Sequence, residues 1–377
     1  MKIVVSPDSF KGSLTAIEAA KAMVAAINEI NPEIETVLLP VADGGEGTLE
    51  PLLEATNGQI ISVKVQDPIG RLVEAEYGIL GNGETCVIEM AKASGLTLLT
   101  SDERNPLIAS TYGTGQLIRH ALDAGFRKFI IGIGGSATND GGTGMLNALG
   151  MRFLNIDGTE LELGAEALST LHQIDDSFFD ERIKVSEFII ACDVDNPFVG
   201  ANGATTIFGP QKGVTPEMVQ RIDDNLTILA NKIEAMTGVA LHNEPGAGAA
   251  GGLGGAFLAF FPVELKPGIE VVMKAIDFHD QILGASLIIT GEGKSDFQTL
   301  SGKAPIGVAN AAKELQIPVA LISGYVDNDS YASLSEHFLA IASVVNDSIT
   351  QQESIQNATI HLRRRTFEMV KRIIKEV

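Results

Sequence analysis

Short apolar segments alternate with amphipathic segments at both ends of this 377-residue chain. Residues 3–5 and 36–41 are apolar runs, and between them apolar side chains recur at helical spacing over residues 15–29. Continuous apolar runs are typical of parallel strands that are buried on both faces, and a helix usually connects two such strands. The pattern therefore predicts a βαβ unit and a sheet covered by helices.

The last part of the chain repeats this alternation, whereas the middle differs. Strands are expected at residues 287–290, 319–323 and 340–345, and helices near residues 304–315 and 351–375. In the middle, short apolar segments at residues 60–65, 73–80 and 85–90 are separated by glycine and proline turns, which favours hairpins. Further elements are expected near residues 113–124, 128–133, 188–193 and 216–237.

This change of pattern predicts an α/β protein of two domains. Residues 1–58 and 285–377 are expected to form a three-layer domain with a parallel sheet, and residues 59–284 an inserted mixed α/β domain. A chain of 377 residues is also too long for one ordinary hydrophobic core.

Composition narrows the class of partner. The net charge of -21 argues against nucleic acid and against a membrane surface as binding partners, because both require clustered lysine and arginine.

Cys86 and Cys192 lie in apolar runs and are expected to be free thiols. The apolar stretch at the start of the chain is too short for a signal peptide, so a cytoplasmic location is expected. Residues 245–263 are uncharged but glycine-rich, which indicates a loop opening a buried helix.

Glycine and small polar residues cluster where predicted strands end, which is where open α/β sheets bind ligands. After the first strand, Ser9 and Lys11 precede a helix, where backbone amides and an ammonium group can hold an anion. A capping loop around Ser13 or Thr15 is the alternative. After the second strand, Asp43 and Glu46 lie among glycines, which suggests metal binding or general-base catalysis. An acidic capping box would need the same residue types.

The longest cluster, residues 132–144, follows a predicted strand and precedes a helix. Glycines allow backbone N–H groups to approach phosphate oxygens, hydroxyls add donors, and the aspartate of the loop can face Mg²⁺. The sequence therefore predicts a polyphosphate cradle. The residues expected to contact the nucleotide are Gly134, Gly135, Ser136, Thr138 and Asn139.

Two further clusters carry charge. Asp193 and Asn196 follow an apolar strand, and a carboxylate there can accept a substrate hydroxyl proton, although a turn would use the same residues. Residues 290–303 hold two lysines and two carboxylates, a combination that suits a site for both a metal and an anion. A solvated loop is the alternative. The charged residues of this last cluster are Glu292, Lys294, Asp296 and Lys303.

Three other kinds of site lack support in the sequence. Gly246, Gly248 and Gly251 have dinucleotide-fingerprint spacing, but no strand precedes them. The Gly293-Lys294-Ser295 run lacks the first glycine of a Walker P-loop, because Ile288 occupies that position. The six histidines show no spacing typical of a zinc site.

In this order, the clusters resemble the type-1 glycerate kinase family over essentially the whole chain. The resemblance rests on residues 6–14, 40–48, 87–96, 110–115, 132–144, 192–197, 208–213, 245–255 and 290–303. It implies phosphorylation of D-glycerate by ATP and Mg²⁺, usually on the 2-hydroxyl, and two α/β domains with the site in the cleft between them. Lys294 stands where many relatives have arginine, and the cation is retained.

The chemistry of each residue type suggests its role in the reaction. Asp193 is expected to be the general base, and Lys11 and Lys294 to neutralise anionic groups of the reactants. Asp43, Glu292 and Asp296 are expected to hold Mg²⁺, and Ser9, Asn196 and Lys303 to contact the substrate. The alternatives are phosphorylation at the 3-position, a kinase for another small hydroxy acid, and a two-lobed anion-binding protein without chemistry.

Overall fold

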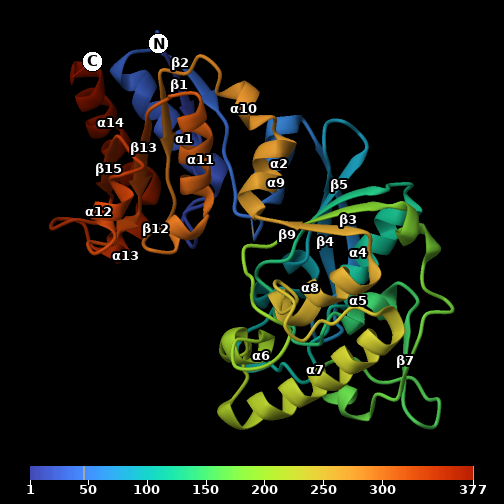
Figure 1. The fold of residues 1–377 in the computed structure, drawn as a ribbon. Helices are drawn as coiled ribbons and strands as arrows, with labels where there is room; N and C mark the ends of the chain where they lie inside the picture. The colour runs from blue at the N-terminus through green and yellow to red at the C-terminus, as the bar shows by residue number, and fades with distance from the viewer. Residues whose placement is uncertain (46, 377) are drawn as a thin grey trace. The chain divides into compact units, whose positions relative to one another are not determined.

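The computed structural model describes residues 1–45 and 47–376. Glu46, proposed above for metal binding or base catalysis, lies outside the described residues. The chain divides into two compact units (Figure 1). The terminal unit comprises Met1–Asp43, Glu50–Thr56 and Pro267–Val377, and the central unit comprises Gly44–Leu49 and Asn57–Lys266.

The compact units differ from the predicted domains mainly at residues 267–284. This segment forms α9 (Gly268–Ala275) and α10 (Phe278–Gln281) and belongs to the terminal unit, where α9 contacts α11 (Ala304–Glu314). The division into two domains, with limits at residues 58 and 285, stays a prediction.

The terminal unit contains a five-stranded parallel sheet in the order β15-β13-β11-β1-β2. Its strands are β1 (Lys2–Val5), β2 (Glu35–Leu38), β11 (Leu287–Thr290), β13 (Val319–Ser323) and β15 (Ala340–Ser343). The three middle strands are almost wholly buried, as continuous apolar runs predict. The same expectation is wrong for β2, which is half exposed because it lies at the sheet edge.

Helices cover both faces of this sheet. α1 (Ala16–Ile30) begins at a capping box, in which Thr15 Oγ1 accepts the Glu18 N–H and Glu18 Oε2 accepts the Thr15 N–H. Its apolar face packs against the sheet beside α14 (Ala358–Glu376) (Figure 1). The connections β1–α1–β2 and β11–α11–β13 run in opposite directions across the sheet, so right-handed crossovers place α1 and α11 on opposite faces. The expected three layers are confirmed.

The C-terminal segment forms two helices where one was expected. α13 (Gln351–Gln356) ends at Asn357, whose φ of -120° and ψ of 34° lie outside the helical region, and α14 follows. The expectation of one helix near residues 351–375 is therefore wrong. The other elements of the terminal unit are α2 (Leu49–Thr56, whose first residue belongs to the central unit), α12 (Tyr331–Leu334), β12 (Lys294–Ser295) and β14 (Tyr325–Val326).

The central unit has a mixed six-stranded sheet in the order β10-β9-β6-β5-β4-β3. The strands are β3 (Gln59–Gln66), β4 (Leu72–Ile79), β5 (Thr85–Glu89), β6 (Lys128–Gly132), β9 (Glu187–Ala191) and β10 (Val263–Lys266). The first three pair antiparallel, which confirms the predicted hairpins, and the others pair parallel. β10 was not predicted, because two of its four residues are charged.

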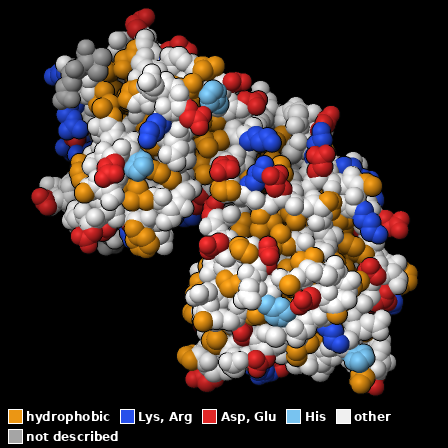
Figure 2. Space-filling view, in the orientation of Figure 1, with side chains coloured by type: hydrophobic (Ala, Val, Ile, Leu, Met, Phe, Trp, Pro, Cys, Tyr) orange, Lys and Arg blue, Asp and Glu red, His pale blue; other side chains and the backbone are white. Residues whose placement is uncertain are grey.

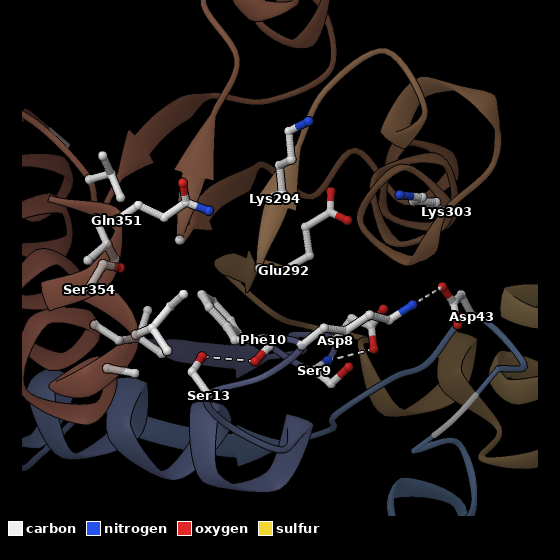
Figure 3. A pocket seen from close by; sticks show the side chains of 18 residues that line it. Asp8, Ser9, Phe10, Ser13, Asp43, Glu292, Lys294, Lys303, Gln351 and Ser354 are labelled. Carbon is white, nitrogen blue, oxygen red and sulfur yellow. Dashed lines mark hydrogen bonds and ion pairs between the residues drawn. The ribbon is translucent and has the colours of Figure 1, made fainter. Parts of the chain in front are cut away.

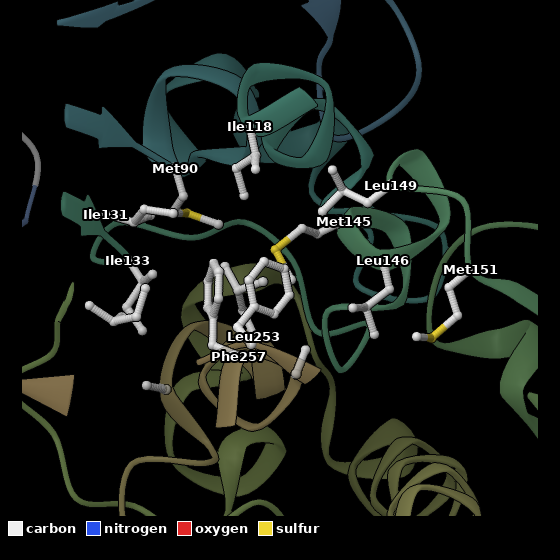
Figure 4. Close-up of a cluster of buried hydrophobic side chains, with 14 of the residues drawn as sticks. Met90, Ile118, Ile131, Ile133, Met145, Leu146, Leu149, Met151, Leu253 and Phe257 are labelled. Carbon is white, nitrogen blue, oxygen red and sulfur yellow. The ribbon is translucent and has the colours of Figure 1, made fainter. Parts of the chain in front are cut away.

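Short helices and one long helix complete the central unit. They are α3 (Ala91–Ser94), α4 (Tyr112–Asp123), α5 (Thr143–Ala148), α6 (Ala204–Phe208), α7 (Pro216–Thr237) and α8 (Ala249–Phe260), with a small sheet of β7 (Arg152–Leu154) and β8 (Gln173–Asp175). Side chains from the sheet, α5 and α8 form one core, where Ile131, Met145 and Phe257 are fully buried (Figure 4). The predicted buried helix after the glycine-rich loop is α8.

The remaining expectations from composition concern the thiols, the surface and membranes. Cys86 is buried, Cys192 is half-buried, and both are free thiols, as predicted. Acidic and basic side chains are interspersed over the visible face of each unit (Figure 2). Among the described helices, none combines the length and the apolar character that spanning a bilayer requires.

Candidate active site

The sheet of the terminal unit has a topological switch point between β1 and β11. From β1 the chain moves to β2 on one side, and from β11 it moves to β13 on the other. The loops after two such strands diverge and leave a crevice at their carboxyl ends. A pocket of about 210 Å³ lies there. Of the predicted site residues, it is lined by Ser9, Lys11, Asp43, Glu292, Lys294 and Lys303 (Figure 3).

Asp8 also lines this pocket, although sequence analysis gave it no role. It follows β1 and is only 6% exposed, and its Oδ1 accepts the Ser9 N–H at 2.6 Å. Burial, followed by the nearby charge of Asp43, raises the pKa of the Asp8 carboxyl to about 7. This carboxyl group therefore changes charge near neutral pH.

Glu292 follows β11 and is held in place by hydroxyl groups. Its Oε1 accepts hydrogen bonds from Ser295 Oγ at 2.8 Å and from Thr299 Oγ1 at 2.7 Å. Burial raises the pKa of this carboxyl group above its usual range. Asp8 and Glu292 thus project from the ends of two adjacent buried strands, where the backbone fixes their positions.

Two lysines beside these carboxylates remain accessible. Lys11 Nζ lies 3.5 Å from Asp43 Oδ2, and Lys294 Nζ lies 2.9 Å from Asp296 Oδ2. Their side chains are 68% and 62% exposed, so both ammonium groups can reach a ligand. The charge of Asp43 is the main cause that raises the pKa of Lys11. The third lysine, Lys303, donates to Gln298 Oε1 at 3.2 Å.

Lys294 is positioned by the close approach of two backbone segments, at Gly293 and Gly324. It begins β12, which pairs parallel with β14. A Cβ atom on Gly324, directly before β14, would lie 2.5 Å from the carbonyl oxygen of Gly293. Glycine is therefore required at position 324 to bring the two short strands together.

Asp296, predicted to hold Mg²⁺ together with Asp43 and Glu292, does not line the pocket. Its Oδ1 accepts the Gln298 N–H at 2.9 Å, and its Oδ2 faces Lys294. Mg²⁺ usually takes one or two protein carboxylates, with waters and phosphate oxygens completing its shell. Asp43 and Glu292 supply carboxylate oxygens of this kind in one pocket. Within residues 1–45 and 47–376, no ready-made group of three or more possible metal-ligand residues occurs.

The glycine-rich loop at residues 132–144 belongs to the central unit and follows β6. Thr138 and Asn139 are fully buried, and Asn139 Nδ2 donates to Thr205 Oγ1 at 2.9 Å. Thr138 Oγ1 and Asn139 Oδ1 have no hydrogen-bond partner among the described residues. These two side chains are enclosed, and Ser136 is itself only 5% exposed, so direct contacts of the loop with a ligand would come mainly from Gly134 and Gly135.

A buried lysine supports this loop from within. Lys212 is 1% exposed, and its Nζ donates to Ser136 Oγ at 2.7 Å and to the Thr138 carbonyl oxygen at 2.8 Å. Burial lowers the pKa of Lys212 to about 7. When protonated, this ammonium group adds positive charge directly behind Ser136.

The aspartate of the same loop has a structural role. Asp140 is fully buried, and its Oδ2 accepts hydrogen bonds from the Thr111 N–H and hydroxyl and from the Gly144 N–H. Its Oδ1 accepts the Gly142 N–H at 3.1 Å. The expectation that this carboxylate faces Mg²⁺ is therefore wrong.

Asp193 and Asn196 lie in the loop after β9, also in the central unit. Asp193 is exposed, two residues beyond the end of the strand. Asn196 Nδ2 donates to the carbonyl oxygen of Asn202 at 2.9 Å, and the Asn196 carbonyl oxygen accepts the Gly248 N–H. Asn196 therefore organises its own loop, the turn role that the sequence left open.

Three buried charged residues had no predicted role: Asp8, Lys212 and Glu89. Glu89, at the end of β5, accepts the Leu49 N–H at 2.5 Å and is also bonded by the amides of Gly47 and Thr48. It thereby holds the second glycine cluster. Asp8 and Lys212 lay within clusters that the sequence did identify, and Asp8 had the signal of a charged residue three positions after an apolar strand.

Known proteins resemble the chain along its length. The model of the glycerate kinase family matches residues 3–375. Glycerate kinase of Bacillus subtilis (strain 168) is 48% identical over 364 residues, which cover 97% of this chain and 95% of that protein. Glycerate 2-kinase of Escherichia coli (strain K12) is 46% identical over 358 residues, which cover 95% and 94%.

A solved structure agrees with these matches. The crystal structure of a glycerate kinase 2 from Salmonella typhimurium LT2 superposes with a TM-score of 0.88 at 44% sequence identity. The match covers 100% of this chain and 99% of that one. The chain belongs to the glycerate kinase family.

Proposed function

We propose that this protein transfers the γ-phosphoryl group of ATP to the 2-hydroxyl of D-glycerate. Membership of the family supports the reaction class, and the Escherichia coli relative is named as a 2-kinase. The observation that carries the proposal is the pocket at the switch point of the terminal sheet, which combines accessible lysines with buried carboxylates. Phosphoryl transfer requires this combination, because its transition state spreads negative charge over several oxygens.

Lys11 and Lys294 neutralise anionic groups of the two reactants. Their ammonium groups are exposed, and Asp43 and Asp296 hold them in place. Preorganised cations of this kind stabilise a transition state without reorganisation during the reaction. Lys303 lines the same pocket and, with Ser9, contacts the substrates.

Asp43 and Glu292 would hold Mg²⁺. Bound there, the ion would neutralise and orient phosphate oxygens. Asp296, both of whose oxygens are engaged, would act by fixing Lys294. Because Asp43 also faces Lys11, metal binding and the placement of that lysine are coupled.

The base that accepts the hydroxyl proton is a carboxylate. Asp193, the choice from the sequence, is exposed. Asp8 is the second candidate, and its buried position and pKa of about 7 favour it, since a general base works best near the operating pH. The pH dependence of kcat/KM in the Asp8→Asn and Asp193→Asn variants separates these candidates.

Gly134 and Gly135, supported by the buried Ser136, bind an anionic group of a substrate, and the nucleotide phosphates are the first candidate. The buried ammonium group of Lys212 behind Ser136 favours an anion in front of it. Thr138 and Asn139 support the loop from its enclosed side.

A substrate panel tests the activity. The pure protein would be incubated with Mg²⁺, γ-labelled ATP and, in separate reactions, D-glycerate, L-glycerate, glycolate or D-lactate. We expect label transfer with D-glycerate at the highest kcat/KM. Preference for another acid would indicate a different hydroxy-acid kinase, and binding of D-glycerate without transfer would indicate an anion-binding protein.

A further inference from the structure

The pocket of the terminal unit has two chemically different ends. One end holds the lysines and carboxylates described above, and the other is formed by Val344, Ile355, Ala358 and Leu362, among other apolar side chains. Figure 3 shows Phe10 between these ends, with Gln351 and Ser354 on one side and Lys303 and Asp43 on the other. The ligand of such a pocket must itself be apolar at one end and anionic at the other.

The apolar end carries a polar side chain that can form hydrogen bonds with a ligand. Gln351 is the first residue of α13, whose start is fixed by Thr350, with its side chain accepting the Glu353 N–H at 3.2 Å. In the part of the chain that the structure describes, the Gln351 amide makes no side-chain hydrogen bond, and it points into the pocket (Figure 3). An amide offers one acceptor and two donors, which matches the edge of a purine base.

The two substrates differ in how much apolar surface they could bury at the apolar end of the pocket. Glycerate is a three-carbon acid whose carbons carry oxygen, so it has little apolar surface to bury. A nucleoside triphosphate has a planar ring at one end and phosphates at the other. Ligand sites typically combine an apolar wall with a few polar groups that fix orientation.

We propose that the pocket binds the nucleotide, with the purine ring between Phe10 and the apolar face of α13 and α14. Gln351 contacts the edge of the ring, and the phosphate chain extends toward Lys11 and Lys294. This inference rests on the proposed kinase function, because it uses ATP as the phosphoryl donor. It places the base in a unit other than the one that holds the glycine-rich loop at residues 132–144.

A bulky substitution tests the ring site. Ala358 is half-buried at the start of α14, so Ala358→Trp would fill the apolar end. We expect the Kd of MgADP, measured by calorimetry, to rise about tenfold or more while the KM of D-glycerate stays unchanged. Ile360→Trp is the matched control, because Ile360 lies on the same helix, is 66% exposed and does not line the pocket.

A second pair of variants tests the ring site independently, in case Ala358→Trp does not fold. Gln351→Leu should raise the KM of ATP and reduce discrimination between ATP and GTP, whereas Gln352→Leu, on the adjacent exposed residue, should do neither. Inorganic tripolyphosphate has no base, so its Kd should be unchanged by Gln351→Leu and raised by Lys294→Ala.

The outcomes separate this inference from the proposed function. Unchanged ADP affinity in a folded Ala358→Trp together with unchanged nucleotide preference in Gln351→Leu would overturn the ring site, as would an effect confined to the KM of D-glycerate. If the wild-type protein binds ADP with the expected variant pattern but transfers no label to D-glycerate, the nucleotide site stands and the proposed acceptor is wrong.

Discussion

Lys294 and Lys11 are the residues whose charge should matter most for the rate. Because they act on charge that develops in the transition state, Lys294→Ala and Lys11→Ala should each lower kcat by on the order of 10². Lys313→Ala, which removes an exposed lysine from α11, is the control and should retain full turnover. Steady-state kinetics with both substrates measures the effect. Near-normal turnover in both site variants would place the essential cations elsewhere.

Asp8 and Asp193 can be distinguished by the pH dependence of catalysis. If Asp8 is the base, it must be ionised, so kcat/KM should rise with pH through about 7, its folded-state pKa. Asp8→Asn should abolish most turnover at every pH. Asp193→Asn should then keep both the rate and the profile. The reverse pattern, a severe loss in Asp193→Asn alone, would restore Asp193 as the base.

The buried carboxyl group of Asp8 should also reduce stability at neutral pH. Its pKa rises from 3.8 to about 7 on folding, so between these values the folded state holds a proton that the unfolded state has lost. The free energy of unfolding therefore falls as pH increases through this window. Asp8→Asn cannot ionise, so its stability relative to wild type should increase from pH 4 to pH 8.

Denaturant unfolding at several pH values measures this difference. Asp102→Asn, which alters an exposed carboxylate, serves as the control. A constant difference between wild type and Asp8→Asn across this range would mean that the carboxyl group titrates normally in the folded protein.

Among the structural elements, the glycine-rich loop is held by Lys212, and this contact should make the free energy of unfolding depend on pH. Burial lowers the pKa of Lys212 from 10.5 to about 7, so between these values the unfolded state binds more protons than the folded state. Stability from this group therefore increases with pH from about 7 toward 10. Lys212→Met should lack this increase and should be less stable throughout, because Ser136 Oγ and the Thr138 carbonyl oxygen lose their donor.

Lys184→Met, at an exposed site in the same unit, is the control for Lys212→Met. Chemical denaturation from pH 7 to pH 9.5 gives the comparison. Parallel stability curves for wild type and Lys212→Met would show that the buried ammonium group stays protonated throughout.

Elements with strong local signals could be predicted from the sequence. Pro216 at the start and Gly238 after the end mark α7, and Thr15 with Glu18 marks the start of α1. Lys212 shows the limit of such signals. It lies next to glycines in a segment that looks exposed, and only tertiary packing brings it to Ser136, 76 positions away in the sequence. Long-range pairing of this kind leaves no local pattern.

At the scale of the whole chain, the ordered set of glycine clusters identified the family from the sequence. It also located the ligand end of the terminal sheet, because charged residues occur in the loops that follow its strands. It did not distinguish side chains that face the pocket, such as Glu292, from Asp296 only four positions later. That distinction depends on the hydrogen bonds of a short loop, in which Lys294 and Gln298 engage both oxygens of Asp296.

The position of the new phosphate ester shows which hydroxyl group of D-glycerate accepts the phosphoryl group. The protein would be incubated with D-glycerate, Mg²⁺ and ATP, and the product examined by proton-coupled ³¹P NMR. An ester at C2 has one neighbouring proton and gives a doublet, whereas an ester at C3 has two and gives a triplet. We predict one new doublet that grows as ATP is consumed. A triplet would contradict transfer to the 2-hydroxyl, and the absence of any new ester signal would contradict the kinase itself.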